Sequence, residues 1–182
     1  MSLIYLDTET TGLDPARHHI WEMAYAVDGG PILSAVVPHT TIGADPDALR
    51  IGKYEERGGY LPADSEFDRC LATEIEGETL VAANPAFDAA FLRARWGKAP
   101  WKYRLLDVEA YAMGALGYDV PQGLKTIAHD LRAADWDIPE PNHSAAGDVA
   151  TLRDCHLALR AIYADVPAEP SDQGDNTEEQ VS

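Results

Sequence analysis

The order in which strand-forming and helix-forming segments follow one another constrains this fold more than any other feature. Strands are predicted at residues 3–6, 21–27 and 32–37, and an Asp-Gly-Gly-Pro turn at residues 28–31 connects the last two. Successive hairpins of this kind form an antiparallel meander. Beyond residue 79 strands alternate with helices, which is typical of parallel strands. We therefore expect an α/β domain whose mixed sheet has three antiparallel strands and then two parallel strands, flanked by helices.

The remaining segments are assigned from apolar periodicity and from helix start signals. Short strands are expected at residues 79–83 and 103–106. Helices are expected at residues 45–57, 64–76, 85–96, 107–117, 124–131 and 147–164. Asp64 and Asp107 each precede a helical pattern and are predicted N-caps, and Asn84 before Pro85 is a third.

Length and composition favour a single domain followed by a tail. The chain has 182 residues, which suits one domain at residues 1–165. Residues 166–182 carry five acids and neither bases nor aromatics, so we expect a disordered acidic tail. No apolar run approaches the roughly 20 residues of a membrane helix, and residues 1–11 lack the features of a signal peptide. A cytoplasmic location without a membrane partner is therefore expected.

The charge balance is strongly acidic, with 14 Lys and Arg against 31 Asp and Glu and a net charge of −17. Such a surface argues against electrostatic wrapping of duplex nucleic acid. Residues 93–104 depart from this trend, because they carry five bases, no acid and interleaved Trp and Tyr residues. This stretch is either a contact for single-stranded nucleic acid or a helix end with core aromatics.

Two carboxylates, Asp7 and Glu9, follow the apolar residues of the first predicted strand. Residues two apart in a strand project from the same face, so both carboxylates are expected to share one small site. Like charges this close raise each other's pKa unless a cation lies between them. Oxygen ligands suit a hard divalent metal, and the pair therefore predicts a metal site, with a solvated strand end as the alternative.

Two further acids are predicted to face the protein interior. Asp88 precedes Phe91 and Leu92 at helical spacing, and Asp148 precedes an apolar stripe in the last helix. An unpaired charge is costly on such a face. A buried Arg partner or a hydrogen-bonded structural role explains either acid alone, whereas a shared cation explains both together with the first pair.

His143 lies five residues before Asp148, in the loop that leads to the last helix. A loop histidine is commonly a surface residue. Its place beside a suspected metal ligand makes it a candidate general base, because imidazole titrates near neutral pH.

These residues carry a resemblance to a known family. Residues 7–13 (Asp-Thr-Glu-Thr-Thr-Gly-Leu), residues 84–92 (Asn-Pro-Ala-Phe-Asp-Ala-Ala-Phe-Leu) and the pair His143 and Asp148 resemble, in chain order, the three motifs of the DEDDh 3′–5′ exonucleases. This family includes the proofreading subunit of bacterial DNA polymerase III and has a ribonuclease H-like fold. The likeness spans roughly residues 3–164. Many relatives have a His before the Asn of the second motif, where this chain has Ala83.

The resemblance implies a role for each matching acid. Asp7 bridges two Mg²⁺ or Mn²⁺ ions, Glu9 and Asp148 hold the ion that activates water, Asp88 binds the second ion, and His143 is the general base. Two such cations stabilise the attacking and the leaving oxygen of a displacement at phosphorus. Hydrolysis then releases nucleoside 5′-monophosphates from a free 3′ end.

The resemblance also implies contacts with the substrate, in which Thr10 holds the terminal nucleotide, Leu13 wedges against the last base, and Phe91 is a third substrate-binding residue. The expected substrate is single-stranded DNA, and a DNA polymerase or another replication protein is a candidate partner. An exoribonuclease of the oligoribonuclease or tRNA-trimming type remains open, because the motifs do not reveal contacts with a 2′-hydroxyl. A non-catalytic acidic binding module with a structural metal is the alternative from another class.

Overall fold

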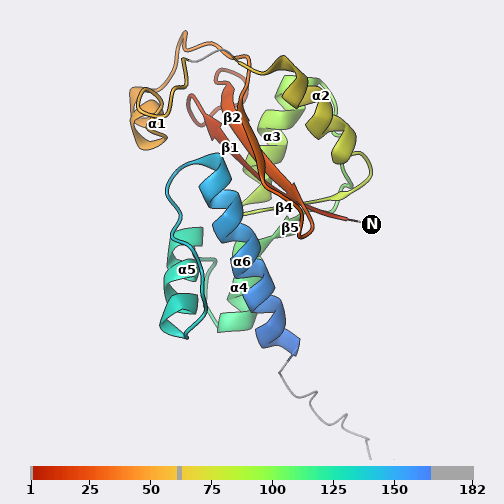
Figure 1. Cartoon of the computed structure of the whole chain (residues 1–182), viewed down its shortest axis with the longest axis vertical. Coiled ribbons are helices and arrows are strands. Elements are labelled where there is room, and N and C mark those ends of the chain that lie inside the picture. The colour runs from red at the N-terminus through yellow and green to blue at the C-terminus, as the bar shows by residue number, and fades with distance from the viewer. Residues whose placement is uncertain (1, 61–62, 165–182) are drawn as a thin grey trace, which may run out of the picture.

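The structure is a computed structural model that describes residues 2–60 and 63–164. The expected acidic tail at 166–182 lies outside the described residues. One five-stranded sheet runs through the centre in the order β3-β2-β1-β4-β5 (Figure 1). Its strands are β1 (Leu3–Thr10), β2 (Ile20–Val27), β3 (Leu33–Val36), β4 (Thr79–Ala82) and β5 (Leu106–Asp107).

Strand pairing follows the predicted order. Strand β2 pairs antiparallel with both β1 and β3, while β4 pairs parallel with both β1 and β5. The expected mixed sheet of three antiparallel and two parallel strands is therefore confirmed.

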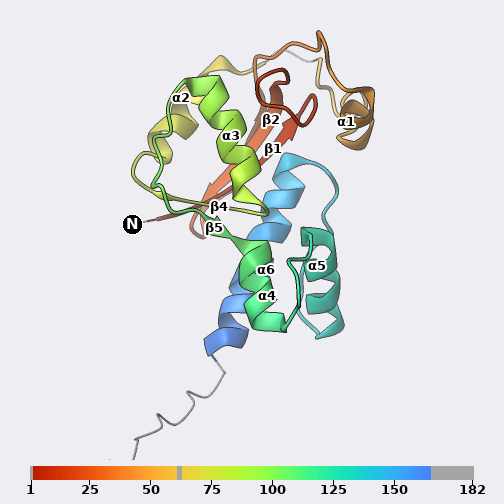
Figure 2. The same cartoon turned by 180° about the vertical axis from the view of Figure 1, so that it is seen from behind.

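The described part of the chain has six helices, five of which cover the two faces of the sheet. They are α1 (Pro46–Ile51), α2 (Ser65–Glu74), α3 (Pro85–Trp96), α4 (Val108–Leu116), α5 (Leu124–Ala133) and α6 (Ala145–Ala164). Helices α2 and α3 pack on one face, and α6, with α4 and α5 beside it, packs on the other (Figures 1 and 2). No helix among the described residues combines the length and the apolar character that a membrane span requires.

Alternation along β1 divides its side chains between two cores. Ile4 and Leu6 belong to the core under α2 and α3, whereas Tyr5 belongs to the core under α4, α5 and α6. The Tyr5 hydroxyl lies 2.9 Å from Nδ1 of His156 on α6. Because side chains alternate with a period of two, the odd-numbered residues that follow on β1 face the same side as α6.

Several predicted boundaries were wrong. The first strand continues to Thr10 instead of ending at residue 6, because residues 7–10 remain paired with β2. The helix expected at 45–57 ends at Ile51, and Lys53 beyond it has a left-handed backbone (φ 52°) that no helix continues. The strand expected at 103–106 is reduced to Leu106–Asp107, and the last helix begins two residues earlier than predicted.

The predicted helix caps are partly confirmed. Asp64 accepts hydrogen bonds from the amides of Glu66 and Phe67, and Asp107 caps α4 in the same way. The side-chain cap predicted for Asn84 was wrong. Asn84 precedes α3 with a left-handed backbone (φ 54°), and its side chain makes no capping hydrogen bond.

Candidate functional site

Three carboxylates meet where the N-terminal end of α6 approaches β1. Carboxylate oxygens of Asp7, Glu9 and Asp148 all lie within 4.8 Å of one another, and each residue is partly buried. Asp7 and Glu9 face α6 because they share the strand face of Tyr5, and Asp148 lies in the first turn of α6. The structure therefore brings together three of the four acids that the sequence singled out.

The fourth acid, Asp88, lies close by but outside this three-carboxylate cluster. Its side chain on α3 is only 3% exposed, which confirms the predicted buried position. The hydroxyl of Thr8 donates a 2.7 Å hydrogen bond to Asp88 Oδ1. Thr8 occupies the opposite face of β1 from Asp7, so it meets α3 instead of α6. Sequence reasoning missed this partner, although strand alternation already separates Thr8 from its two acidic neighbours.

Burial raises the pKa of the acids on β1. The pKa of Asp7 lies well above its usual value, chiefly because of desolvation and next because of the charges of Asp88 and Glu9. Burial raises the pKa of Glu9 to about 8, against the lowering effect of the Arg57 guanidinium. In the metal-free protein, protonation is therefore the alternative to a bound cation at these groups.

The two helix-borne acids show the same trend. Burial raises the pKa of Asp88 to about 7, although the Thr8 hydrogen bond acts in the opposite direction. Burial also raises the pKa of Asp148, opposed by the backbone amide of Asn142 and the charge of His143. The protein places too little positive charge near these carboxylates to neutralise all of them. A cluster of oxygen ligands in such a setting fits a hard divalent cation such as Mg²⁺ or Mn²⁺.

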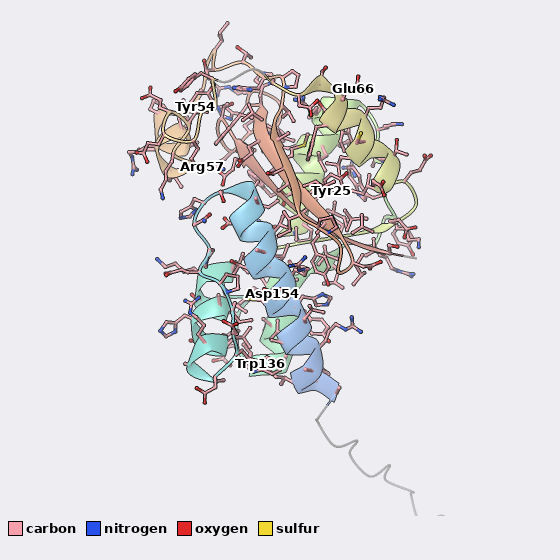
Figure 3. All side chains as sticks on the ribbon, viewed as in Figure 1. Tyr25, Tyr54, Arg57, Glu66, Trp136 and Asp154 are labelled. Atoms are coloured by element: carbon pink, nitrogen blue, oxygen red, sulfur yellow. The ribbon has the colours of Figure 1, made fainter. Side chains whose placement is uncertain are left out.

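An arginine that the sequence did not reveal lies at the edge of the cluster. Arg57 forms an ion pair with Glu22 on β2, and its Nη1 lies 3.8 Å from Glu9 Oε1. Both Arg57 and Tyr54 lie beside α1, and Arg57 is the one nearer to the N-terminal end of α6 (Figure 3). Among the described residues Asp7, Asp88 and Asp148 form no ion pair with Lys or Arg, so the alternative of a buried Arg partner for Asp88 or Asp148 is not supported. Arg57 pairs with Glu22 and lies near Glu9 instead.

One signal for this arginine was present in the sequence. Glu22 lies directly opposite Glu9 in the β1–β2 ladder, and like charges in that position are destabilising without a cation. The partner could not be chosen from the sequence, however, because Arg57 comes from a loop that was predicted to be helix.

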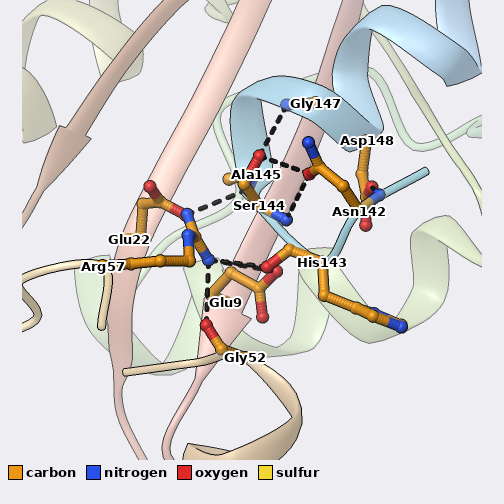
Figure 4. A network of polar contacts seen from close by, with 10 residues as sticks. All are labelled: Glu9, Glu22, Gly52, Arg57, Asn142, His143, Ser144, Ala145, Gly147 and Asp148. Atoms are coloured by element: carbon orange, nitrogen blue, oxygen red, sulfur yellow. Dashed lines mark hydrogen bonds and ion pairs between the residues drawn. The ribbon is translucent and has the colours of Figure 1, made fainter. Parts of the chain in front are cut away.

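His143 reaches the site through its main chain. Its carbonyl oxygen accepts a 2.6 Å hydrogen bond from Arg57 Nη1, and its backbone is left-handed (φ 59°). The amide of Asn142 donates to Asp148 Oδ1 at 2.9 Å, which ties the same loop to the carboxylate cluster. The imidazole is exposed and extends away from Glu9 and Arg57 (Figure 4).

A groove of about 550 Å³ adjoins the cluster. Its walls come from the loop at residues 140–143, the start of α5, Asp148 and two lysines, Lys53 and Lys125. Neither lysine has an ion-pair partner within the parts of the chain that the structure describes. In an otherwise acidic protein, they leave positive charge available beside His143.

The residues expected to contact substrate occupy different environments. Leu13 is 76% exposed at the end of β1, so its side chain is available to a ligand. Thr10 is buried, and its hydroxyl donates a 2.7 Å hydrogen bond to the carbonyl of Gly12. Phe91 is only 2% exposed and packs against Phe87 with 4.8 Å between ring centroids.

The basic stretch at residues 93–104 lies away from the cluster. The amide of Lys102 bonds to the carbonyl of Glu78, just before β4 begins, whereas the cluster lies toward the other end of the parallel strands. The guanidinium of Arg95 is occupied by Asp68, and the Trp101 side chain is buried. For these two residues the structure favours the structural interpretation.

No protein-family model matches the chain, and no curated protein matches it in sequence. Solved structures do match its fold. A zinc-ion-bound Escherichia coli exonuclease I in complex with single-stranded DNA aligns with a TM-score of 0.65 at 16% identity, over 90% of this chain and 41% of that one. A product-bound exonuclease I aligns with a TM-score of 0.66 at 16% identity, over 88% of this chain and 43% of that one.

A third structure, E. coli exonuclease I with a dT13 oligonucleotide, aligns with a TM-score of 0.61 at 17% identity. It is matched over 88% of this chain and 40% of its own length. The present chain thus spans about two fifths of the length of these proteins. At such identity the likeness establishes the fold, and the ribonuclease H-like mixed sheet expected from the sequence is confirmed.

Proposed function

We propose that this chain is a metal-dependent 3′–5′ exonuclease of the DEDDh type that hydrolyses single-stranded DNA from its 3′ end. The observation that carries the proposal is the cluster of Asp7, Glu9 and Asp148, with Asp88 beside it. The fold shared with exonuclease I structures that contain single-stranded oligonucleotides supports it. We assign residues 1–165 to the exonuclease domain and residues 166–182 to a separate acidic segment.

In this proposal the four acids hold two divalent cations, Mg²⁺ or Mn²⁺. We assign Asp7 to both cations for two reasons. It shares the cluster with Glu9 and Asp148, and the charge of Asp88 raises its pKa more than any other neighbouring charge does. When bound, such cations lower the pKa of a water molecule and offset the charge that develops on the phosphoryl oxygens. The buried setting strengthens these electrostatic effects.

His143 is the proposed general base that removes a proton from the attacking water. Its exposed ring lies on the loop that is tied to Asp148 through the amide of Asn142, and the proposal requires the side chain to turn toward the cluster when substrate binds. Proton transfer by a positioned imidazole suits operation near neutral pH. The products are then nucleoside 5′-monophosphates.

The groove beside His143 is the proposed path of the single strand. Lys53 and Lys125 can contact its phosphates, and the exposed Leu13 can contact its last base. Thr10 and Phe91 are buried, so a substrate contact of either one requires the chain around it to move. Because the net charge is −17 and the groove offers two lysines, we expect modest affinity for long strands.

The decisive experiment uses 5′-labelled single-stranded DNA and RNA of equal length, digested side by side with Mn²⁺ and with excess chelator. We expect the DNA to shorten from its 3′ end in single-nucleotide steps, and chelator to stop the reaction. Faster digestion of RNA favours the exoribonuclease alternative. If both strands remain intact, the nuclease proposal is overturned in favour of a non-catalytic binding module with a structural metal.

A polymerase partner and a cytoplasmic location remain predictions.

Metal binding and pH are expected to be linked in the stability of this protein. Glu9 and Asp88 have folded pKa values of about 8 and about 7, above the roughly 4 of unfolded acids. The folded state therefore binds more protons in this window, and stability of the metal-free protein falls as pH rises from about 4 to about 8. Metal ligands must be deprotonated, so Mn²⁺ competes with fewer protons at pH 8.

Thermal unfolding with chelator or with Mn²⁺ at pH 6 and pH 8 measures this linkage. We expect the rise in Tm on addition of Mn²⁺ to be larger at pH 8. Glu9→Gln is the control, because its neutral side chain removes part of the dependence. Equal Mn²⁺ shifts at the two pH values contradict the metal assignment.

A further inference from the structure

Arg57 connects three segments that surround the three-carboxylate cluster. Its guanidinium pairs with Glu22 on β2 and donates hydrogen bonds to two main-chain carbonyls, Gly52 at 3.0 Å and His143 at 2.6 Å (Figure 4). Two of these segments are separated from Arg57 by 35 and 86 positions in the sequence. One side chain therefore fixes the loop before α6 against the sheet and against the loop after α1.

The guanidinium is itself held in place by aromatic packing. Its central carbon lies 5.1 Å from the centroid of the fully buried Trp21 ring. Tyr54 packs edge-on against Trp21, and its hydroxyl lies 2.7 Å from Nε2 of His39. Only 18% of the Arg57 side chain is exposed. A planar, five-donor group in such a setting is oriented before any ligand binds.

Glu22 extends this network to the helix that carries Asp148. Its carboxylate accepts the amide of Ala145 at 2.9 Å, at the start of α6, in addition to its ion pair with Arg57. The carbonyl of residue 143 and the amide of residue 145 are thus both tied to this ion pair. His143 has a left-handed backbone, which is unfavourable for a non-glycine residue. The hydrogen bonds at residues 143 and 145, together with the Asn142–Asp148 bond, hold the loop in this conformation.

We propose that Arg57 is a positioning residue that holds the loop of His143 and the first turn of α6 against β2, and so keeps His143 beside the carboxylate cluster. It acts through the main chain of His143 and through Glu22, without ligating metal. The kinetic part of this inference rests on the proposed nuclease function, whereas the structural part does not.

The kinetic test is a double-mutant cycle with Arg57→Ala and His143→Ala. Loss of a supporting hydrogen-bond partner typically lowers activity about 10- to 100-fold, and we expect this loss in kcat with little change in KM. If Arg57 acts through His143, the double variant is no slower than His143→Ala alone. A double variant slowed by both full factors overturns the inference.

Two further variants separate positioning from charge. Arg57→Lys keeps the charge near Glu9 but cannot span Glu22, Gly52 and His143 together, so we expect it to remain slower than the wild type. Full activity in Arg57→Lys overturns the inference, because charge alone then suffices. Arg50→Ala is the matched control, since Arg50 is exposed and, among residues 2–60 and 63–164, forms an ion pair only with Asp47 on α1.

Hydrogen exchange tests the structural part independently of nuclease activity. We expect the amides of residues 142–147 to exchange about tenfold faster in Arg57→Ala, while the sheet is unaffected, because the loop loses hydrogen bonds. Arg57→Lys provides the same readout if the alanine variant does not fold. Unchanged exchange in this segment overturns the inference. Faster exchange in a protein without nuclease activity overturns only the proposed function.

Discussion

Asp7→Asn is expected to abolish 3′-end hydrolysis and, at the same time, to stabilise the metal-free protein. Asp7 shares the cluster with Glu9 and Asp148, and its pKa is raised by burial and by Asp88 and Glu9. The amide has nearly the same shape but supplies no anionic ligand. Since metal-based stabilisation of a transition state is worth several kcal/mol, the loss in rate is roughly 10³-fold or more.

The stability gain follows from the direction of the same pKa shift. At pH 8 the folded protein resists ionisation of Asp7 more than the unfolded chain does, so the aspartate disfavours folding. A neutral asparagine removes this penalty, and a gain of ~1 kcal/mol corresponds to about 2–4 °C in Tm for a chain of this size.

Nuclease assays and thermal unfolding with chelator measure the two effects together. Asp47→Asn is the matched control, because Asp47 is exposed on α1 and pairs with Arg50. An Asp7→Asn protein that keeps more than a tenth of wild-type activity contradicts the assignment. A lower Tm in the metal-free variant contradicts the electrostatic account of the cluster.

His143→Ala is expected to lower kcat by about 10²- to 10⁴-fold, the usual contribution of a general base. Its ring lies outside the group of clustered oxygen ligands, so we expect Mn²⁺ affinity to change little. This separates it from Asp7→Asn, which loses both metal affinity and rate. Single-turnover digestion of a short labelled strand measures the chemical step, and Mn²⁺ titration measures binding.

The control for this second experiment is His129→Ala. His129 is exposed on α5 and lies next to Asp130, with its Nδ1 2.9 Å from the carboxylate. We expect this variant to match the wild type. An unchanged rate in His143→Ala removes that residue from the proposed mechanism and leaves the carboxylates as the only assigned groups.

Local rules were sufficient for much of the fold. The carboxylates of Asp64 and Asp107 cap helices because each lies within two or three residues of the amides that it accepts. The burial of Asp88 followed from its helical spacing to Phe91 and Leu92. Strand alternation placed Asp7 and Glu9 on one face.

Contacts between distant segments explain what the sequence could not predict. The extension of β1 to Thr10 depends on pairing with β2, and the shape of the loop that carries Arg57 depends on packing against Trp21. Neither interaction leaves a periodic signal in its own segment. At Asn84 a local rule made a wrong prediction. Asparagine is a favourable capping residue, but Asn84 has a left-handed backbone and its side chain makes no capping hydrogen bond.

The sequence alone determined the mixed sheet, the two faces of β1 and the identity of the four acids, because these follow from periods of 2.0 and 3.6 residues within single segments. Only the tertiary structure decided that Asp148 joins Asp7 and Glu9 while Asp88 stays with Thr8, and that Arg57 pairs with Glu22. Those pairings depend on how helices and loops pack across the sheet, and the energy of such packing belongs to residues far apart in the chain.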